Sequence, residues 1–516
     1  MSLINTIYTG FSHKLIKEIE NSRTDPCQYQ KEWFQKLIKA GRETLFGQEH
    51  NFNKIKSLRD FREHVPIRDY NAFAPYIERL RHGENYTLWN QKVKWFAKSS
   101  GTSSDKSKFI PITPDSLHIT HYGGFKRMLS FYVACHNGSK ILSGKALTLG
   151  GSVNIDNMGG AKSFSGDLSA ILLKNSPFIV EMLRTPSRKS ALMADFNAKI
   201  EAICRESCRC NVTSFSGVPS WNLILMNKVL EHTGKQNLLE VWPDMELFMH
   251  GGIGFEPYRE IYKALIPSGK MHYLENYNAS EGYFAFQDDL STNSMLLTVN
   301  NGIFYEFIPM PLLDKAMRGE IKEIPTLEEV GTRVQYAMVI STCGGLWRYL
   351  IGDCVEFVSL APHRIKITGR TSLFINAFGE ELMISNAEKA LAAACRETDS
   401  TVTDFTVAPV FMTLGDENTS FAKKGYHKWA IEFGREPENI EKFAELLDIE
   451  LTKTNSDYEA KRAGNATMER LQIISLPRGS FVKWMESRNK LGGQNKVPRL
   501  YGNSRFIDEL TNQQDF

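Results

Sequence analysis

Cysteine is scarce in this chain. Eight cysteines are spread over 516 residues, and such a scatter does not make the dense disulfide framework of small secreted domains. Only Cys204, Cys208 and Cys210 lie close together, and neither the paired spacing nor the fourth ligand of a zinc site is evident near them. We interpret them as ordinary part-buried thiols, and the cysteine usage predicts a reducing compartment, by default the cytoplasm.

An excess of one charge and a long apolar run are also absent. Lys and Arg total 62 against 59 Asp and Glu, a net charge of +3 with neutral His, and no long run of either sign suggests a nucleic-acid partner. No segment approaches the roughly 20 apolar residues of a spanning helix. Residues 1–22 interrupt their apolar positions with charges, among them Lys14, Lys17 and Glu20, unlike a signal peptide. The sequence predicts a soluble protein without a nucleic-acid or membrane partner.

The length and the 42% hydrophobic content predict two or more domains. Residues 1–90 should form a helical cap, because apolar residues recur at helical spacing in Ile4–Ile19 and Trp33–Phe46. From Lys92 onward, short β-type runs alternate with helices such as Ser116–Cys135 and Lys189–Glu206. This alternation predicts an α/β fold with mainly parallel sheets, which bind ligands on the loops after their strands.

The pattern of predicted strands and helices changes again after about Leu296. The runs Gly302–Pro309, Gln335–Thr342 and Cys354–Leu360 are β-like with few helical stretches between them, which predicts an antiparallel or β-barrel-like subdomain. From about residue 372 to the end, mixed elements predict a smaller α+β domain. No internal repeat, low-complexity tract or coiled-coil heptad run is evident, so the oligomeric state stays open.

A loop rich in small hydroxyl residues follows the β-type run that ends at Lys98. It reads Ser99-Ser100-Gly101-Thr102-Ser103-Ser104, and Lys106 and Lys108 come soon after. Backbone N–H and side-chain O–H groups around a glycine can converge on phosphate oxygens, and lysines add positive charge. The common P-loop, G-x-x-x-x-G-K-[ST], does not occur here. An ordinary Ser/Thr-rich turn is the alternative.

Four further segments carry groups that suit a nucleotide. Glu281 follows Ser280 after a predicted strand, and a carboxylate beside a hydroxyl can hold Mg²⁺ and a phosphate oxygen. Asp353 is expected in a Gly-Asp turn, where it can accept two hydrogen bonds from a ribose diol or simply be solvated. Arg370 can bind the ribose or phosphates or pair with a surface carboxylate, and Lys496 can be a mobile cation or a solvated tail lysine.

In order and content these motifs resemble the auxin-responsive acyl acid amido synthetases, of the adenylate-forming superfamily that includes acyl-CoA synthetases and luciferase. The resemblance extends from about residue 4 to residue 505. It is specific because four short motifs occur together in order. They are Ser-Ser-Gly-Thr-Ser at 99–103 with Lys108 and Pro111, Tyr-x-x-Ser-Glu at 277–281, Tyr-x-x-Gly-Asp at 349–353, and Gln-x-Lys-x-Pro-Arg at 494–499.

The resemblance implies ATP and Mg²⁺ as cofactors and an adenylation domain over residues 1–371. It implies a small, mobile C-terminal domain over residues 372–516, with a hinge near Thr371 to Leu373. The implied nucleotide-binding residues are Ser99, Ser100, Thr102, Ser103, Lys108, Tyr277, Ser280, Asp353 and Arg370. Among them, the loop hydroxyls would cradle the phosphates, Ser280 would touch the α-phosphate and Asp353 the ribose. Glu281 would hold the metal, and Lys496 would neutralise phosphate charge during adenylation.

The activity implied is the activation of a carboxylic acid as acyl-AMP, with release of pyrophosphate, and transfer of the acyl group to an amino acid. An acyl-CoA ligase shares the first step and differs in the acceptor. A noncatalytic nucleotide-binding scaffold is the third alternative, because Ser104 and Asp105 replace two glycines of the family loop. A carboxylate there repels bound polyphosphate unless Lys106 or Lys108 screens it. A kinase ranks last because its signatures are absent.

The sequence does not specify the acid or the amine. Tyr122, Phe125, Met128 and Trp221 are plausible wall positions of the acid pocket, and core packing is the alternative role for each.

Overall fold

The computed structural model describes most of the chain, and its contacts divide the chain into two compact units. The described residues are 3–99, 108–158, 161–252, 254–371, 374–375, 380, 382–410, 425–455, 458–459, 462, 468–488 and 497–512. The larger unit comprises residues 1–252 and 268–367, and the smaller unit comprises residues 253–267 and 368–516. Residues 254–267 therefore pack with the C-terminal part of the chain.

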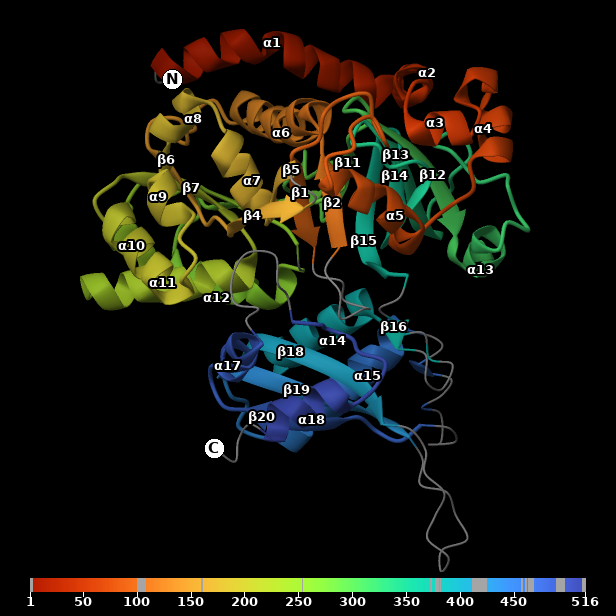
Figure 1. The fold of residues 1–516 in the computed structure, drawn as a ribbon. Helices are drawn as coiled ribbons and strands as arrows, with labels where there is room; N and C mark the ends of the chain where they lie inside the picture. The colour runs from red at the N-terminus through yellow and green to blue at the C-terminus, as the bar shows by residue number, and fades with distance from the viewer. Residues whose placement is uncertain are drawn as a thin grey trace, which may run out of the picture. The chain divides into compact units, whose positions relative to one another are not determined.

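Residues 1–90 are mostly helical, as the apolar spacing predicts. Side-chain caps begin four of these helices: Asp25, Thr44 and Asp69 each accept a hydrogen bond from a backbone N–H of the first turn, and Ser57 forms a capping box with Asp60. The elements are α1 (Leu3–Thr24), α2 (Pro26–Gly41), α3 (Leu45–Glu49), η1 (Phe52–Lys54), α4 (Leu58–His64) and α5 (Tyr70–Arg81). They are the red and orange helices of Figure 1.

A four-stranded sheet follows the helical cap. Its order is β2-β1-β5-β4, with β1 at Trp95–Ser99, β2 at Lys108–Ile112, β4 at Val153–Met158 and β5 at Ala161–Gly166. Strands β1 and β2 are antiparallel, and Ser99 lies opposite Lys108 at the loop end of the pair. The predicted phosphate loop therefore joins the two strands of a hairpin.

A second sheet of eleven strands runs through the larger unit in the order β12-β13-β14-β15-β11-β10-β9-β8-β7-β3-β6. The strands β9, β8, β7, β3 and β6 are parallel to one another. The pairs β9–β10, β10–β11, β11–β15, β13–β14 and β12–β13 are antiparallel. The bounds are β3 (Lys145–Thr148), β6 (Arg184–Thr185), β7 (Val212–Gly217), β8 (Leu247–His250), β9 (His272–Ala279), β10 (Gly282–Phe286), β11 (Met295–Leu297), β12 (Ile303–Pro309), β13 (Gln335–Thr342), β14 (Tyr349–Leu360) and β15 (His363–Arg370). The α/β fold class is confirmed, and so is a change from parallel to antiparallel pairing, but the change comes at β10, earlier than the predicted position after about Leu296.

Two helices differ from their predicted form. The predicted helix Ser116–Cys135 begins as a π-helical segment, η2 (Ser116–His121), before α6 (Tyr122–Cys135). The prediction of one helix over Lys189–Glu206 is wrong, because Asp195 caps a new helix by accepting a hydrogen bond from the backbone of Ala198. The segment is α9 (Arg188–Ala191) followed by α10 (Phe196–Ser207). The remaining helices of this unit are α7 (Leu168–Asn175), α8 (Phe178–Met182), α11 (Pro219–Thr233), η3 (Leu238–Glu240), η5 (Met310–Leu312) and α13 (Leu313–Met317).

Aromatic side chains join the helical cap to the antiparallel half of the large sheet. Trp347 is fully buried and packs edge-on against Phe52, with ring centres 4.8 Å apart. Beside it, Glu306 accepts hydrogen bonds from both Arg62 and Arg348, and all three side chains are almost completely buried. A buried carboxylate needs such partners, so this group ties α4 to the sheet.

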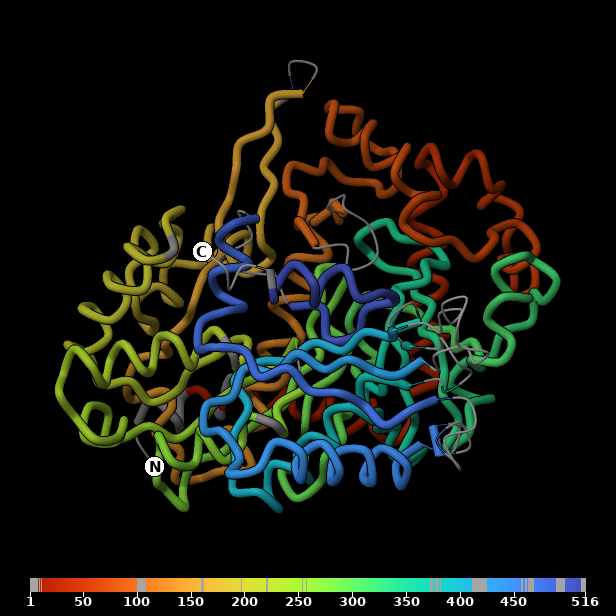
Figure 2. The backbone as a smooth tube through the Cα atoms, turned by 90° about the horizontal axis from the view of Figure 1, so that it is seen from below, coloured from red at the N-terminus to blue at the C-terminus, as the bar shows by residue number. Residues whose placement is uncertain are grey.

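The smaller unit is built on a three-stranded sheet, β18-β19-β20, whose strands lie side by side in Figure 2. Its elements are η4 (Glu256–Tyr258), α12 (Arg259–Leu265), β16 (Phe374–Ile375), β17 (Leu382–Met383), α14 (Ile384–Glu397), β18 (Thr401–Val410), β19 (Tyr426–Arg435), α15 (Ile440–Thr454), β20 (Gln472–Leu476), α17 (Ser480–Ser487) and α18 (Arg505–Asn512). The predicted α+β character is confirmed. Among the described helices of the chain, none is long and apolar enough to cross a bilayer.

Candidate functional site

The loop end of the β1–β2 hairpin is held against helix α5. The backbone N–H of Phe109 donates to the hydroxyl of Tyr70 over 2.8 Å, and the ammonium of Lys108 lies 5.8 Å from the centre of the same ring. Ser99 and Lys108 are opposite one another. The other predicted loop residues, Ser100, Thr102 and Ser103 with Ser104 and Asp105, lie outside the described residues.

Ser280 and Glu281 form the two-residue turn between β9 and β10, since Ala279 pairs directly with Gly282. Both turn residues are buried, with Glu281 about one-tenth exposed (9%). A turn carboxylate is normally solvated, so burial of Glu281 requires hydrogen-bond partners or a bound cation. Tyr277 lies two residues earlier on β9 than Ala279 and is also buried.

The prediction of a Gly-Asp turn at residues 352–353 is wrong. Both residues lie inside β14, at a bulge where the register with β13 shifts between the pairs Ala337–Cys354 and Val339–Leu350. Gly352 has φ +89°, which a glycine adopts without a Cβ clash. A bulge changes the direction in which the neighbouring side chains project, and this one presents Asp353 toward β9.

Two crossed hydrogen bonds join the second and third motifs. The hydroxyl of Tyr277 donates to Asp353 Oδ2 over 2.5 Å, and the hydroxyl of Tyr349 donates to Glu281 Oε1 over 3.5 Å. Each motif thus supplies a tyrosine that orients the carboxylate of the other. Strand β9 lies four steps from β14 in the sheet order, which is about 19 Å in a flat sheet. The sheet must therefore curl, which agrees with the barrel-like character that the sequence predicts.

The hairpin and the crossed pairs share one neighbourhood. The pKa of Tyr70 is raised, mainly by burial and in smaller part by the negative charge of Glu281. Tyr70 also contacts the hairpin through Phe109. Tyr349 of the third motif packs against Phe73 of the same helix, with ring centres 5.7 Å apart. Helix α5 therefore contacts both the hairpin and the third motif.

His121 is a residue of this region that the sequence analysis missed. Its Nδ1 lies 3.3 Å from Asn278 Oδ1, inside the second motif, and burial lowers its pKa to about 4. Its Nε2 is buried and has no hydrogen-bond partner among the described residues. The neutral ring donates from Nδ1 to the amide oxygen, which leaves Nε2 as an acceptor. A single histidine on a helix carries no signal in sequence.

Helix α6 approaches this region closely because of a glycine. Tyr283 comes two residues after Glu281. A Cβ added at Gly124 would lie 2.4 Å from its ring. Of the four predicted wall positions, Met128 and Trp221 are buried, Tyr122 is half-buried and donates to Leu172 O over 2.6 Å, and Phe125 is 41% exposed. Met128 packs in a hydrophobic cluster with Tyr283 and is therefore a core residue.

Of the two remaining predicted residues, only Arg370 is described, and it belongs to the smaller unit. Arg370 is the last residue of β15, and Lys496 lies outside the described residues. Arg499, three positions after that lysine, is fully buried and donates to Asp404, to Phe405 O and to the hydroxyl of Tyr258. The fourth motif is therefore anchored in the smaller unit by its arginine.

The cysteine group behaves as packed thiols. Cys204 is buried, and desolvation raises its pKa to about 12, which disfavours the thiolate that binds metals. Within the described ranges, no group of three or more His, Cys, Asp or Glu side chains is arranged to hold a metal ion.

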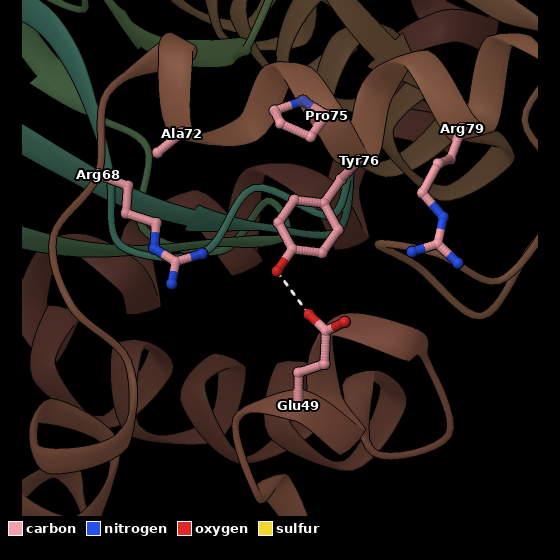
Figure 3. Close-up of a pocket in the computed structure, with 6 residues that line it drawn as sticks. All are labelled: Glu49, Arg68, Ala72, Pro75, Tyr76 and Arg79. Carbon is pink, nitrogen blue, oxygen red and sulfur yellow. Dashed lines mark hydrogen bonds between the residues drawn. The ribbon is translucent and has the colours of Figure 1, made fainter.

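A surface pocket of about 510 Å³ opens on the helical cap. Figure 3 shows its lining residues, Glu49, Arg68, Ala72, Pro75, Tyr76 and Arg79. Its polar groups are partnered inside the protein, because Tyr76 donates to Glu49 over 2.5 Å and Arg79 binds Glu84 through two nitrogens. None of the predicted site residues lines it.

Comparison with known proteins identifies the family. The GH3 family N-terminal domain matches residues 15–271, the central domain residues 296–370 and the C-terminal domain residues 385–505. Jasmonoyl–L-amino acid synthetase JAR6 of Nicotiana attenuata is 24% identical, over 96% of this chain and 95% of that protein.

Two solved structures share the fold. A GH3.15 acyl acid amido synthetase superimposes with a TM-score of 0.77 at 17% identity, over 97% of this chain and 95% of that one. A 2-hydroxyisobutyryl-CoA ligase in complex with 2-HIB-AMP superimposes with a TM-score of 0.57 at 13% identity, over 98% and 92%. The chain belongs to the GH3 family, whose acyl acid amido synthetase members are ligases.

Proposed function

We propose that this protein is an ATP-dependent acid–amino acid ligase that activates a carboxylic acid as acyl-AMP and transfers the acyl group to an amino acid. One observation carries the proposal. The crossed pairs Tyr277–Asp353 and Tyr349–Glu281 bring together two carboxylates of separate motifs, and Tyr349 packs against helix α5, which also holds the β1–β2 hairpin through Tyr70. Two oriented carboxylates next to a hydroxyl- and lysine-bearing loop suit the metal, ribose and phosphate groups of Mg·ATP.

The hairpin is the phosphate end of the proposed site. Ser99, Ser100, Thr102 and Ser103 would donate O–H and N–H groups to phosphate oxygens, and Lys108 would add positive charge. The charge of Asp105 opposes this binding, and the lysines at 106 and 108 offset it.

Glu281 and Ser280 fit a magnesium ion. Mg²⁺ takes hard oxygen ligands and commonly binds one or two protein carboxylates together with substrate phosphates. Glu281 is buried at a turn, with one oxygen oriented by Tyr349 and with Ser280 adjacent, which is a donor set of this kind. When bound, the ion would neutralise charge on the phosphates of the substrate.

Asp353 would bind the ribose hydroxyls, held in place by Tyr277. Arg370 would assist at the ribose, and Lys496 would neutralise the phosphates during activation. In this proposal residues 1–371 form the adenylation domain, and residues 372–516 form a domain that rotates about Thr371–Leu373 after the first step, taking the lysine away.

The two steps need little covalent chemistry from the protein. A substrate carboxylate oxygen attacks the α-phosphorus of ATP, and the bond to pyrophosphate breaks. The amine of an amino acid then attacks the acyl carbon, loses a proton and expels AMP. Alignment of the reactants and stabilisation of charge on phosphorus supply most of the rate.

The acceptor distinguishes this proposal from an acyl-CoA ligase, which shares the activation step. The relatives by sequence are amido synthetases, whereas a CoA ligase is similar in fold alone. Sequence similarity over 96% of the chain therefore favours an amino acid as acceptor.

The test is to incubate the protein with Mg·ATP and a panel of alkyl and aryl acids, each with amino acids, with CoA or with neither. Nucleotide and acyl products are then identified by mass spectrometry. AMP, pyrophosphate and an acyl-amino acid are expected. An acyl-CoA product would replace the proposal with the ligase, and ATP binding without turnover would favour a noncatalytic scaffold.

A further inference from the structure

Helix α8 exposes its apolar side chains to solvent. Phe178 is 77% exposed, Ile179 61%, Val180 42%, Met182 50% and Leu183 39%. These five residues, which we call the α8 patch, occupy all but one of the positions from 178 to 183, and no residue of α8 is buried. Single exposed apolar residues are normal in proteins, but a contiguous group marks an interaction surface.

The acidic residue of α8 points inward instead. Glu181 is bound through both oxygens by Arg184, whose side chain is almost fully buried, and it also contacts Arg188 and Ser176. Burial alone would raise the pKa of Glu181, but these hydrogen bonds lower it to about 2. The helix therefore directs its charge to the protein and its apolar residues to the outside, which is the reverse of an ordinary surface helix.

Lysines surround the α8 patch. Lys174 lies in the last turn of helix α7 just before it, with its ammonium over the ring of Phe164. Lys189 lies in α9 just after it, and Lys145 of β3 donates to the carbonyl of Met182. In the described part of the chain, no carboxylate lies within 4 Å of Lys174 or Lys189. Residues 174–189 carry four basic side chains and one acidic side chain, a net charge of +3. Because that acidic residue is already paired with two arginines, the segment that contains the patch is cationic.

The location of α8 leaves the patch accessible. Helix α8 lies beside β6, which is the edge strand of the eleven-stranded sheet, and it stands at the periphery of the larger unit in Figure 1. The patch contains no residue of the proposed nucleotide site.

We propose that the α8 patch docks the protein peripherally on an anionic phospholipid surface. Aromatic and aliphatic side chains enter the boundary between headgroups and acyl chains, while lysines bind anionic headgroups. The sequence predicts no membrane partner because no spanning segment exists, but peripheral docking needs none. A second copy of the chain is the weaker candidate, since a two-fold contact through this patch would place each lysine rim against the other.

The experiment measures binding of the full chain to vesicles by co-sedimentation, with phosphatidylcholine alone and with about 30% phosphatidylserine. The wild type should bind the anionic vesicles, and binding should weaken at high salt. Phe178→Gln with Ile179→Gln should weaken it at least roughly tenfold, because two inserted apolar side chains are lost. Lys174→Glu with Lys189→Glu should weaken it by about fivefold or more for each lysine.

Matched variants separate docking from general effects. Val358→Gln with Leu360→Gln alters two apolar residues of β14 that are 38% and 39% exposed, and Lys270→Glu with Lys315→Glu reverses two exposed lysines outside the rim. Both controls should bind as the wild type does. Circular dichroism and thermal unfolding confirm that the α8 variants remain folded.

Three results would overturn the proposal: no binding of the wild type, equal binding to neutral and anionic vesicles, or binding that the α8 variants leave unchanged. A dimer in analytical ultracentrifugation that Phe178→Gln with Ile179→Gln abolishes would assign the patch to self-association instead. Amide formation does not enter this measurement, so its outcome is independent of the proposed function.

Discussion

Replacement of Tyr277 by phenylalanine tests the crossed pairs directly. The change removes one hydroxyl, which donates to Asp353 Oδ2 over 2.5 Å, and leaves the packing of the ring against Phe284 in place. The proposed consequence is a less well oriented Asp353 and therefore weaker binding of the ATP ribose. The substitution isolates orientation from charge, because the carboxylate itself remains.

The size of the effect follows from the hydrogen bond. A hydrogen bond to a carboxylate contributes about 1.5–3 kcal/mol. Asp353 is only partly buried, so water can replace some of the lost interaction, and the lower value applies. We expect the KM for ATP to rise about tenfold, which corresponds to about 1.4 kcal/mol, with a smaller change in kcat.

The assay is ATP–pyrophosphate exchange at varied ATP, with the acid substrate found in the product screen. Tyr305→Phe is the matched control, because its hydroxyl donates to Thr298 O over 3.1 Å in the same hydrophobic core, outside the proposed site. The control should lose about 1 kcal/mol of unfolding free energy and keep its KM for ATP. If Tyr277→Phe also keeps its KM within about twofold, the reasoning about Asp353 is refuted.

Three further predictions follow from the site. Glu281→Gln should lower the rate of pyrophosphate exchange about 100-fold, because a metal-binding carboxylate is lost; an unchanged rate would remove Glu281 from the metal site. Burial lowers the pKa of His121 to about 4 in the folded protein, against 6.5 in the unfolded chain. The neutral ring therefore contributes its full share of the unfolding free energy above about pH 6.5, and up to about 3 kcal/mol of it is lost as the pH falls toward 4. His121→Gln should therefore flatten the pH dependence of urea unfolding over this range relative to wild type, and equal slopes would contradict the assignment. Gly124→Ala should destabilise the protein by about 1–3 kcal/mol because its Cβ meets Tyr283, whereas Gly123→Ala, which meets mainly a flexible arginine tip, should be neutral or stabilising in thermal unfolding.

The spacing of apolar residues predicted the architecture well, because secondary structure depends largely on local sequence patterns. Apolar spacing in Trp33–Phe46 identified the helical cap, and the alternation of strands and helices up to about Leu296 identified the parallel half of the large sheet. The break in the helix before Asp195 was missed because the apolar pattern continues across it, and one capping side chain decides the boundary.

The motifs showed which residues belong to the candidate site but not how they meet. Asp353 was expected in a turn because Gly-Asp is a typical turn pair. The pairing with β13 instead holds it within a strand, at a bulge. The partnership of Tyr277 with Asp353 depends on the curl of the sheet between β9 and β14, a long-range feature that no local pattern encodes.

His121 and the α8 patch had no sequence signal for a different reason. A buried histidine and a solvated one look alike in sequence, and only the packing around His121 distinguishes them. In sequence, residues 178–183 resemble a buried apolar run. In the structure Glu181 points inward and the apolar side chains around it are exposed.

Isotope transfer tests the central claim most directly. The protein is supplied with Mg·ATP, an amino acid and a carboxylic acid labelled with ¹⁸O in both carboxyl oxygens, and the nucleotide product is analysed by mass spectrometry. Attack of the carboxylate on the α-phosphorus predicts AMP that carries one ¹⁸O, together with an acyl-amino acid that keeps the other. Label in inorganic phosphate with release of ADP, or AMP without label, would contradict acyl-AMP formation.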